Sequence, residues 1–134
     1  MQELLQKAGI ETVLADDAVV TSLGEENSVF ANLSSSLAEI RKLKGVIGYI
    51  IRSNTSAIID IADFDSIFQY AMLTSEILES SLEISKQFNL GALESVLLEG
   101  ENIKVICLSI NDNKIGVFME KSANHAGIIK RILL

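Results

Sequence analysis

The 134-residue sequence has no proline, no tryptophan, one cysteine and one histidine. The absence of proline argues against proline-rich linkers. The single cysteine excludes an internal disulfide, and a single histidine without a cysteine cluster excludes a zinc site. No run approaches the roughly 20 apolar residues of a membrane-spanning helix, and the first residues carry an acidic side chain where a signal peptide carries basic ones. We therefore expect a cytoplasmic protein without membrane insertion.

Basic residues are also few. The chain has 11 lysines and arginines against 18 acidic residues, which gives a formal net charge of −7. Nucleic-acid binding requires a basic footprint because contacts to phosphate dominate the affinity, and an acidic protein is repelled by anionic lipid. We therefore expect no nucleic acid among its partners.

The excess of acid lies in residues 1–26, which contain one lysine and six carboxylates and so have a net charge of −5. In this segment Asp16 and Asp17 separate two short apolar runs, at 12–14 and 18–20. The runs are compatible with a small hairpin or an edge strand, and equally with a loosely attached acidic arm. We divide the chain into this segment and one domain over residues 27–134.

The chain as a whole has a globular composition, with 49% hydrophobic and 22% charged residues. Apolar residues recur at spacings of three and four in the helical stretches and fill shorter runs bounded by turn residues. The pattern predicts helices at about 27–45 and 66–88 and, after Asn124, a short helix at about 125–133. It predicts a hairpin of two strands at about 46–51 and 57–61, and three further strands at about 93–98, 103–110 and 114–120. Because the strands are joined by hairpin-length loops, we expect an α+β fold. In it, a five-stranded antiparallel sheet has the long helix on one face and the first and last helices on the other.

The long helix has more apolar surface than one sheet covers. Its sheet-facing stripe is predicted to contain Ala71, Thr74, Leu78, Leu82 and Ser85. A second apolar flank contains Tyr70, Leu73, Ile77, Ile84 and Phe88. A helix resting on one sheet needs an apolar stripe of about 100° or slightly more, and this arc is much wider. The second flank is covered either by another part of the same chain or by a partner helix, most simply from a symmetric copy.

Catalytic and metal-ligating constellations are absent from the sequence. His125 has neither a nucleophile nor a second ligand and is interpreted as structural or surface-exposed, and Cys107, inside a predicted strand, as a buried inert thiol. The nearest approach to a carboxylate cluster is the group of Asp60, Asp63 and Asp65, which lacks the glycine and the distal glutamate of a calcium-binding loop. The sequence before Lys121 and Ser122 lacks the second glycine of a phosphate loop. We therefore predict that the protein is not an enzyme and has no catalytic residues, no cofactor and no metal.

Three local sequences, together with the order of the predicted elements, resemble the roadblock family, which includes the roadblock-type dynein light chains. The first is Ile40-Arg-Lys-Leu-Lys-Gly45-Val-Ile-Gly48, where a helix passes directly into a strand. The second is Phe88-Asn-Leu-Gly91-Ala-Leu93-Glu94-Ser-Val96-Leu-Leu98-Glu99-Gly100, the passage from the long helix to the third strand. The third is Ala123-Asn124-His-Ala-Gly127-Ile128-Ile129-Lys130, the short last helix. The turn at 54–56 departs from the Asp-Gly type of turn common in the family, and residues 1–26 lie outside the resemblance.

The resemblance implies a non-catalytic dimeric platform, since long helices pair in the family and the sheets join through their third strands. The dimer interface implied here comprises Tyr70, Leu73, Ile77, Ile84, Glu94, Ser95, Val96, Leu97 and Leu98. The implied function is a homodimeric scaffold or regulator of a Ras-like small GTPase, bound at a surface of Gln69, Met72, Glu76, Glu79 and Glu83. The alternative is a small-molecule sensor or interaction domain with profilin-, PAS- or GAF-like layering. A closed cavity with converging polar groups would favour that alternative.

Overall fold

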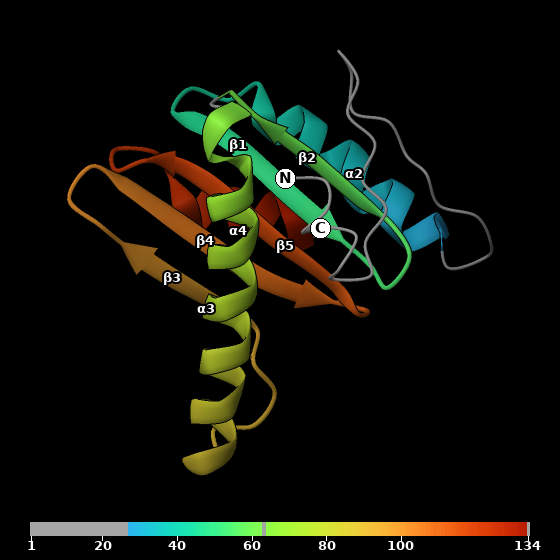
Figure 1. Cartoon of the computed structure of the whole chain (residues 1–134), viewed down its shortest axis with the longest axis vertical. Helices are drawn as coiled ribbons and strands as arrows, with labels where there is room; N and C mark the ends of the chain where they lie inside the picture. Colours follow the sequence, from blue (N-terminus) through green and yellow to red (C-terminus); the bar gives the residue numbers. More distant parts are fainter. Residues whose placement is uncertain (1–26, 63, 134) are drawn as a thin grey trace.

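The computed structural model describes residues 27–62 and 64–133 (Figure 1). Its elements in chain order are α2 (Asn27–Arg41), β1 (Val46–Arg52), β2 (Ala57–Ile61), the 3-10 turn η1 (Phe64–Ser66), α3 (Ile67–Gln87), β3 (Ser95–Glu99), β4 (Ile103–Ile110), β5 (Asn113–Glu120) and α4 (His125–Leu133). The arm or hairpin predicted at residues 1–26 lies outside the described residues, as does Asp63.

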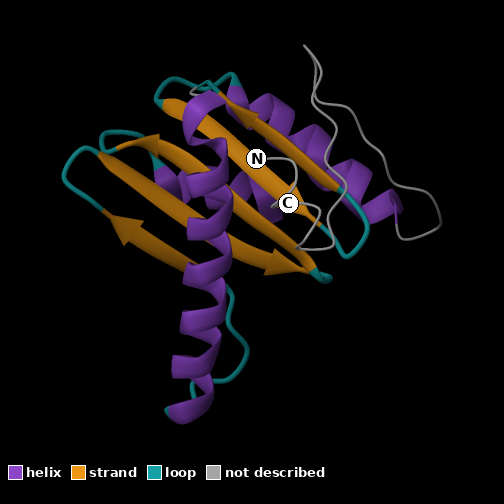
Figure 2. Cartoon of the chain, viewed as in Figure 1, coloured by secondary structure: helices purple, strands orange, loops and turns teal. Residues whose placement is uncertain are grey.

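The five strands form one antiparallel sheet in the order β2-β1-β5-β4-β3. Hairpins join β1 to β2, β3 to β4 and β4 to β5, and the pairing of β1 with β5 brings the two halves of the chain together. α3 crosses one face of the sheet, while α2 and α4 cover the other (Figure 1, Figure 2). The predicted α+β fold, with its antiparallel sheet and its distribution of helices, is confirmed.

The sheet has a hydrophobic core on each face. The core beneath α2 and α4 includes Phe30, Leu37, Tyr49, Ile106 and Ile128. The core beneath α3 includes Ile50, Leu78, Val105, Cys107 and Phe118. Because successive side chains of a strand point to opposite faces, sequence neighbours on β4 contribute to different cores. For this reason the central strands are apolar at both their odd and their even positions.

Two boundaries differ from the sequence pattern by two residues or more, while the ends of β1, α3 and β5 differ by one. α2 ends at Arg41, although the pattern predicted a helix up to Gly45. The N–H groups of Lys42 and Leu43 donate to the carbonyls of Glu39 and Ile40 at 3.1 and 2.9 Å, so the chain tightens into turns there. Gly45 then adopts a φ of 89°, which a residue without Cβ accepts without strain. β3 begins at Ser95 rather than at 93, so Glu94 lies outside the strand.

The two edge strands differ in exposure. In β2 every residue except Asp60 is buried. In β3 Val96 is half-buried and the other residues are exposed. An exposed edge strand presents unpaired backbone N–H and C=O groups to its surroundings. The described sheet therefore has one open edge, at β3.

Candidate interaction surface

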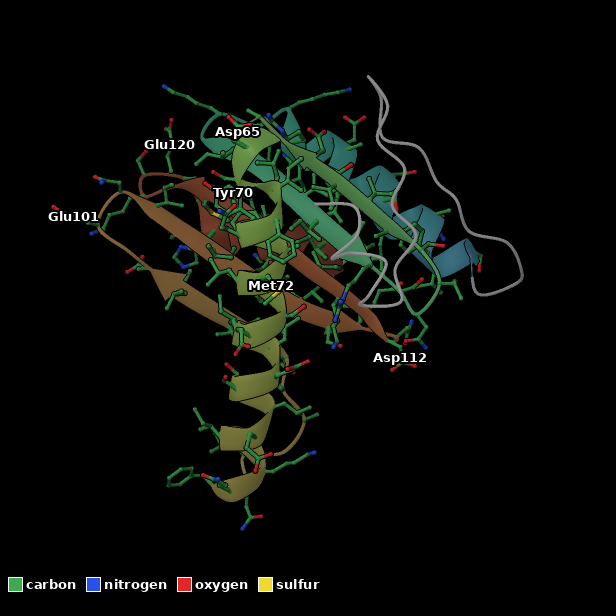
Figure 3. The ribbon with its side chains drawn as sticks, in the orientation of Figure 1. Asp65, Tyr70, Met72, Glu101, Asp112 and Glu120 are labelled. Carbon is green, nitrogen blue, oxygen red and sulfur yellow. The ribbon has the colours of Figure 1, made fainter. Side chains whose placement is uncertain are left out.

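α3 is held on the sheet by its N-terminal half. Ile67, Thr74 and Leu78 are buried there. The ring centroids of Tyr70 and Phe118 lie 4.6 Å apart with the planes tilted by 52°, a favourable aromatic arrangement. Tyr70 and Met72 both lie on this half of the helix (Figure 3), and Met72 is exposed on its outer side. The first part of α3 therefore belongs to the core of the domain.

The C-terminal half of α3 extends past β3 and beyond the sheet (Figure 1). Leu82 and Ile84 are 44% and 52% exposed, and Phe88 and Leu90, which follow the helix, are each 69% exposed. Ser85 is buried in this part, and its hydroxyl donates to the Gly91 carbonyl at 2.8 Å, which fastens the returning chain to the helix. Ile84 and Phe88, four residues apart, lie on the same side of the chain's helical path, and neighbouring exposed apolar side chains mark an interaction site. We refer to Leu82, Ile84, Phe88 and Leu90 as the α3 tip.

β3 provides a second apolar surface on the side of the molecule toward which α3 points. Leu97 and Leu98 are 40% and 47% exposed, and as neighbours in a strand they project to opposite faces. In the described sheet β3 is paired on one side, with β4, for example at Val96 and Cys107. The α3 tip and the open edge together form the candidate interaction surface.

The predicted interface residues fall into two groups. Tyr70, Leu73 and Ile77 are half-buried because they pack against the core beneath α3, together with Val96. The exposed group is Ile84, Glu94, Ser95, Leu97 and Leu98. The second apolar flank is thus covered by the chain's own sheet at its N-terminal end and open at its C-terminal end.

Three tip residues were not predicted as site residues. Phe88 was placed on the second apolar flank but not in the interface, and Leu82 and Leu90 were in neither set. Leu82 was assigned to the sheet-facing stripe, and this is wrong because the helix has already left the sheet at that point and the side chain is exposed. Leu90 lies between α3 and β3, outside any helix or strand. The periodicity of the sequence therefore could not predict that its side chain is exposed. The signal that could have found both residues is the length of the helix compared with the width of a five-stranded sheet.

The outer side of α3 is polar. The family resemblance implies a partner-binding surface on this side of the helix. All five of its residues are exposed, namely Gln69, Met72, Glu76, Glu79 and Glu83. Three of them are glutamates within two helical turns, so this side of the helix is acidic. Their role in binding a partner remains a prediction.

The single histidine and the single cysteine have structural surroundings. Nδ1 of His125 lies 2.9 Å from Nζ of the buried Lys104, and because a lysine ammonium only donates, the ring accepts at Nδ1. Cys107 is buried, and burial raises the pKa of its thiol to about 12. The thiolate that nucleophilic chemistry requires is therefore not formed near neutral pH.

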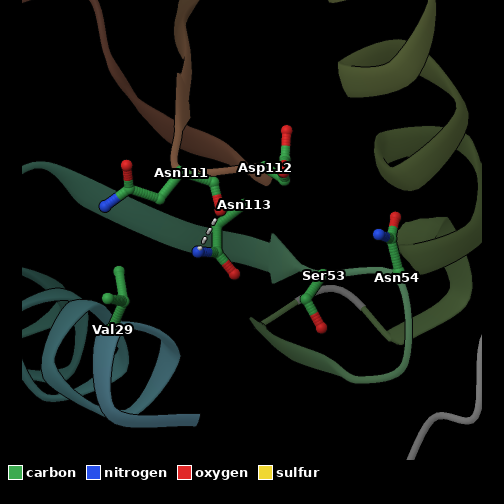
Figure 4. Close-up of a pocket in the computed structure, with 6 residues that line it drawn as sticks. All are labelled: Val29, Ser53, Asn54, Asn111, Asp112 and Asn113. Carbon is green, nitrogen blue, oxygen red and sulfur yellow. Dashed lines mark hydrogen bonds between the residues drawn. The ribbon is translucent and has the colours of Figure 1, made fainter. Parts of the chain in front are cut away.

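A pocket of about 230 Å³ lies at one end of the sheet, between the start of α2 and two strand turns (Figure 4). Its lining residues are Val29, Ser53, Asn54, Asn111, Asp112 and Asn113. The Asn113 amide nitrogen donates to the carbonyls of Ile110 and Asn111 at 3.1 and 3.2 Å, which stabilises the β4–β5 turn. The side chains of Asn111 and Asp112 point in different directions (Figure 4). The side chains of Ser53 and Asn113 thus stabilise turns. The polar groups of the pocket do not converge on one point, whereas those of a sensor cavity would.

The aspartates noted in the sequence are used separately. Asp60 forms an ion pair with Arg41, with Nε and Oδ1 3.5 Å apart, and Asp65 is exposed in η1. Over 27–62 and 64–133, no three His, Cys, Asp or Glu side chains are grouped so that they could hold a metal ion. None of the helices in that part of the chain combines the length and hydrophobicity of a membrane span.

Comparison with known proteins connects this architecture to a known fold. No protein-family model and no curated protein matches the chain. Among solved structures, a Roadblock/LC7 domain from Streptomyces avermitilis aligns with a TM-score of 0.60 and 14% sequence identity, over 75% of this chain and 84% of that chain. The chain has the Roadblock/LC7 fold. The roadblock resemblance of the sequence is thereby confirmed at the level of fold, and in this domain the α3 tip and β3 leave apolar side chains exposed.

Proposed function

We propose that this chain is a non-catalytic scaffold or regulator that acts as a homodimer and binds a Ras-like small GTPase in the cytoplasm. The roadblock fold supports a small regulatory or scaffold domain. The observation that carries the proposal is the α3 tip beside the open edge of β3, because both leave apolar surface and backbone groups in water in a single copy.

A second copy related by a two-fold axis would satisfy both surfaces. Antiparallel pairing of the two β3 strands would give partners to their free N–H and C=O groups and join the sheets. Because α3 crosses its own sheet toward β3 and overruns it, the α3 tip would then lie over the partner's half of the joined sheet. Burial of the tip would contribute roughly 25 cal/mol per Å² of apolar surface removed from water.

The paired helices would place their acidic sides on one outer surface. A GTPase whose switch loops contact this surface in one nucleotide state would be held in that state, because a partner shifts a conformational equilibrium only by its differential affinity. The three glutamates Glu76, Glu79 and Glu83 favour basic residues on the facing loops. This charge pattern supports a specific face of α3 as the docking surface.

The homodimer is tested by the mass in solution, measured by light scattering after size exclusion. The wild type should have twice the chain mass of 14.6 kDa at micromolar concentration, while Ile84→Glu and Phe88→Glu should have the mass of one chain. Gln87→Glu is the matched control, because it adds the same charge at an exposed position of the same helix end and should remain dimeric. A wild type that is monomeric, with both variants indistinguishable from it, contradicts the homodimer.

The GTPase partner is tested by capture of Ras-like GTPases from the same genome, each loaded with GDP or a GTP analogue. One state should bind in preference to the other, and Glu76→Lys with Glu79→Lys should weaken that binding about tenfold or more without changing the mass in solution. Glu101→Lys with Glu120→Lys, at two exposed positions away from α3 (Figure 3), controls for net charge. Absence of binding in both nucleotide states would overturn this part of the proposal.

A further inference from the structure

Two cationic side chains lie next to each other on the α3 side of the sheet. Arg52 on β1 is directly opposite Lys114 on β5 in the strand register, and both are half-buried. On the far side of Lys114, the same row continues to Ser109 on β4. These residues alternate in step with Ile50 and Cys107, which belong to the core beneath α3. The row therefore projects from the face that α3 crosses.

Among the described residues, the two charges have no carboxylate partner. Within the part of the chain that the structure describes, ion pairs join Arg41 to Asp60 and Lys42 to Glu39. Asp112, the acidic residue closest to Lys114 in sequence, lies at the end of the β4–β5 hairpin and makes no ion pair with it (Figure 3). Like charges directly opposite on neighbouring strands destabilise a sheet. In a chain of net charge −7, such a pair of unneutralised cations favours a negatively charged ligand.

We propose that Arg52, Lys114 and Ser109 form a binding site for an oxyanion of the phosphate or carboxylate class. All three groups are donors: the guanidinium has five N–H groups in a planar fork, the ammonium three and the hydroxyl one. The fork binds two oxygens of one oxyanion side by side, and the ammonium adds a point charge. The site is independent of the proposed binding of a GTPase.

α3 lies on the neighbouring row of the sheet, next to this site. Gly116, two residues beyond Lys114 on β5, lies beneath Thr74 of α3, so the helix crosses the sheet immediately beside the cationic row. α3 is packed onto the sheet one row away, at Gly116, and Arg52 and Lys114 are themselves half-buried. A partly desolvated site strengthens charge-assisted hydrogen bonds relative to fully exposed lysines.

Inorganic phosphate is the probe that tests the site. The ¹⁵N-labelled full chain, titrated with sodium phosphate in Tris chloride at constant ionic strength near pH 7, should show saturable shifts of the amides of Arg52, Lys114 and Ser109. Arg52→Gln and Lys114→Gln should each raise the Kd about tenfold, because each removes a charge-assisted hydrogen bond. Lys121→Gln removes the same charge at an exposed position after the other end of β5 and should leave the Kd unchanged.

Two further arms separate the sources of the oxyanion. Binding of phosphate but not of acetate assigns the site to a phosphate ligand, while equal binding of both assigns it to carboxylates of a partner. Tighter phosphate binding after Asp16→Asn, Asp17→Asn, Glu25→Gln and Glu26→Gln in the full chain identifies this chain's own carboxylates as competing ligands. Absence of saturable shifts, or shifts that persist in both Arg52→Gln and Lys114→Gln, overturns the site.

Thermal unfolding gives a second readout. In Tris chloride Lys114→Gln relieves the repulsion between the two cations and should raise the Tm by about 1–4 °C. Saturating phosphate should then raise the Tm of the wild type and leave that of Lys114→Gln almost unchanged, because a ligand stabilises the state that it binds. If saturating phosphate raises the Tm of Lys114→Gln as much as that of the wild type, the proposal fails.

Discussion

Thr74 of α3 lies directly against Gly116 of β5. A Cβ added at Gly116 would come within 2.9 Å of the Thr74 Cγ2 atom, closer than side-chain carbons approach one another in proteins. The Thr74 hydroxyl donates to the Tyr70 carbonyl at 3.0 Å, which holds the threonine side chain in this orientation. The missing side chain at Gly116 therefore sets how closely α3 packs on the sheet.

Gly116→Ala should lower the free energy of unfolding by about 1–3 kcal/mol, because α3 or β5 must move to accept the added methyl group. Urea unfolding measures this effect. Thr74→Ala in the same chain removes the nearest atoms and should recover part of the loss. If the two substitutions are instead strictly additive, the contact does not limit the packing of α3.

His125→Phe should destabilise the domain by about 1–3 kcal/mol, because it leaves the buried Lys104 ammonium without its acceptor. Lys104→Met keeps the apolar stem, removes the buried charge and should cost less. Measured by urea unfolding, His125→Phe should be nearly neutral when Lys104→Met is already present. Equal costs in the two backgrounds would show that the two side chains are not coupled.

The Cys107 thiol should not react with Ellman's reagent in the folded protein at pH 8, because burial removes both access and thiolate. The same chain in guanidinium should react with one equivalent within minutes. The measurement is the absorbance of the released thiolate under both conditions. Rapid and complete reaction of the folded protein would contradict the buried position of β4.

Stability should fall at alkaline pH. Burial raises the pKa of the Cys107 thiol from 9.0 to about 12, and burial, followed by the nearby Asp60 charge, raises the pKa of Tyr49 from 10.0 to about 12. Both groups hold their protons more tightly in the folded state, so their contribution is complete below pH 9 and is lost as the pH approaches 12. The urea midpoint should therefore decline from pH 9 upward.

Cys107→Ala and Tyr49→Phe serve as controls for this pH dependence, since each removes one titrating group. Each substitution should flatten the decline of the midpoint, whatever its effect on stability at neutral pH. A decline that is equally steep in both variants and in the wild type would assign the alkaline loss to other groups.

The order of the elements was predictable because local chemistry marks the ends of the strands. Strands 57–61 and 103–110 were predicted with the bounds that the structure has, since turn residues flank the apolar runs. The end of α2 was not predictable in this way. Lys42 and Lys44 are compatible with a helix, and the turn that replaces it depends on how the chain must enter β1.

The candidate surface was predictable only in part. Periodicity indicates surplus apolar surface on α3, but it does not say where the helix leaves the sheet, and Leu82 is exposed for that reason. The Arg52–Lys114 neighbours and the Lys104–His125 contact join residues far apart in sequence. Both depend on strand register and helix placement, which no local pattern specifies.

The unequal edges of the described sheet limit how copies of this chain can associate. Because β2 is buried and β3 is exposed, β3 is the more accessible of the two edges of the described sheet for pairing with another copy. An association of two copies through β3 would therefore close after two molecules, whereas two exposed edges would permit open-ended fibres. The burial of β2 would then act against amyloid-like growth of a chain with so much apolar surface.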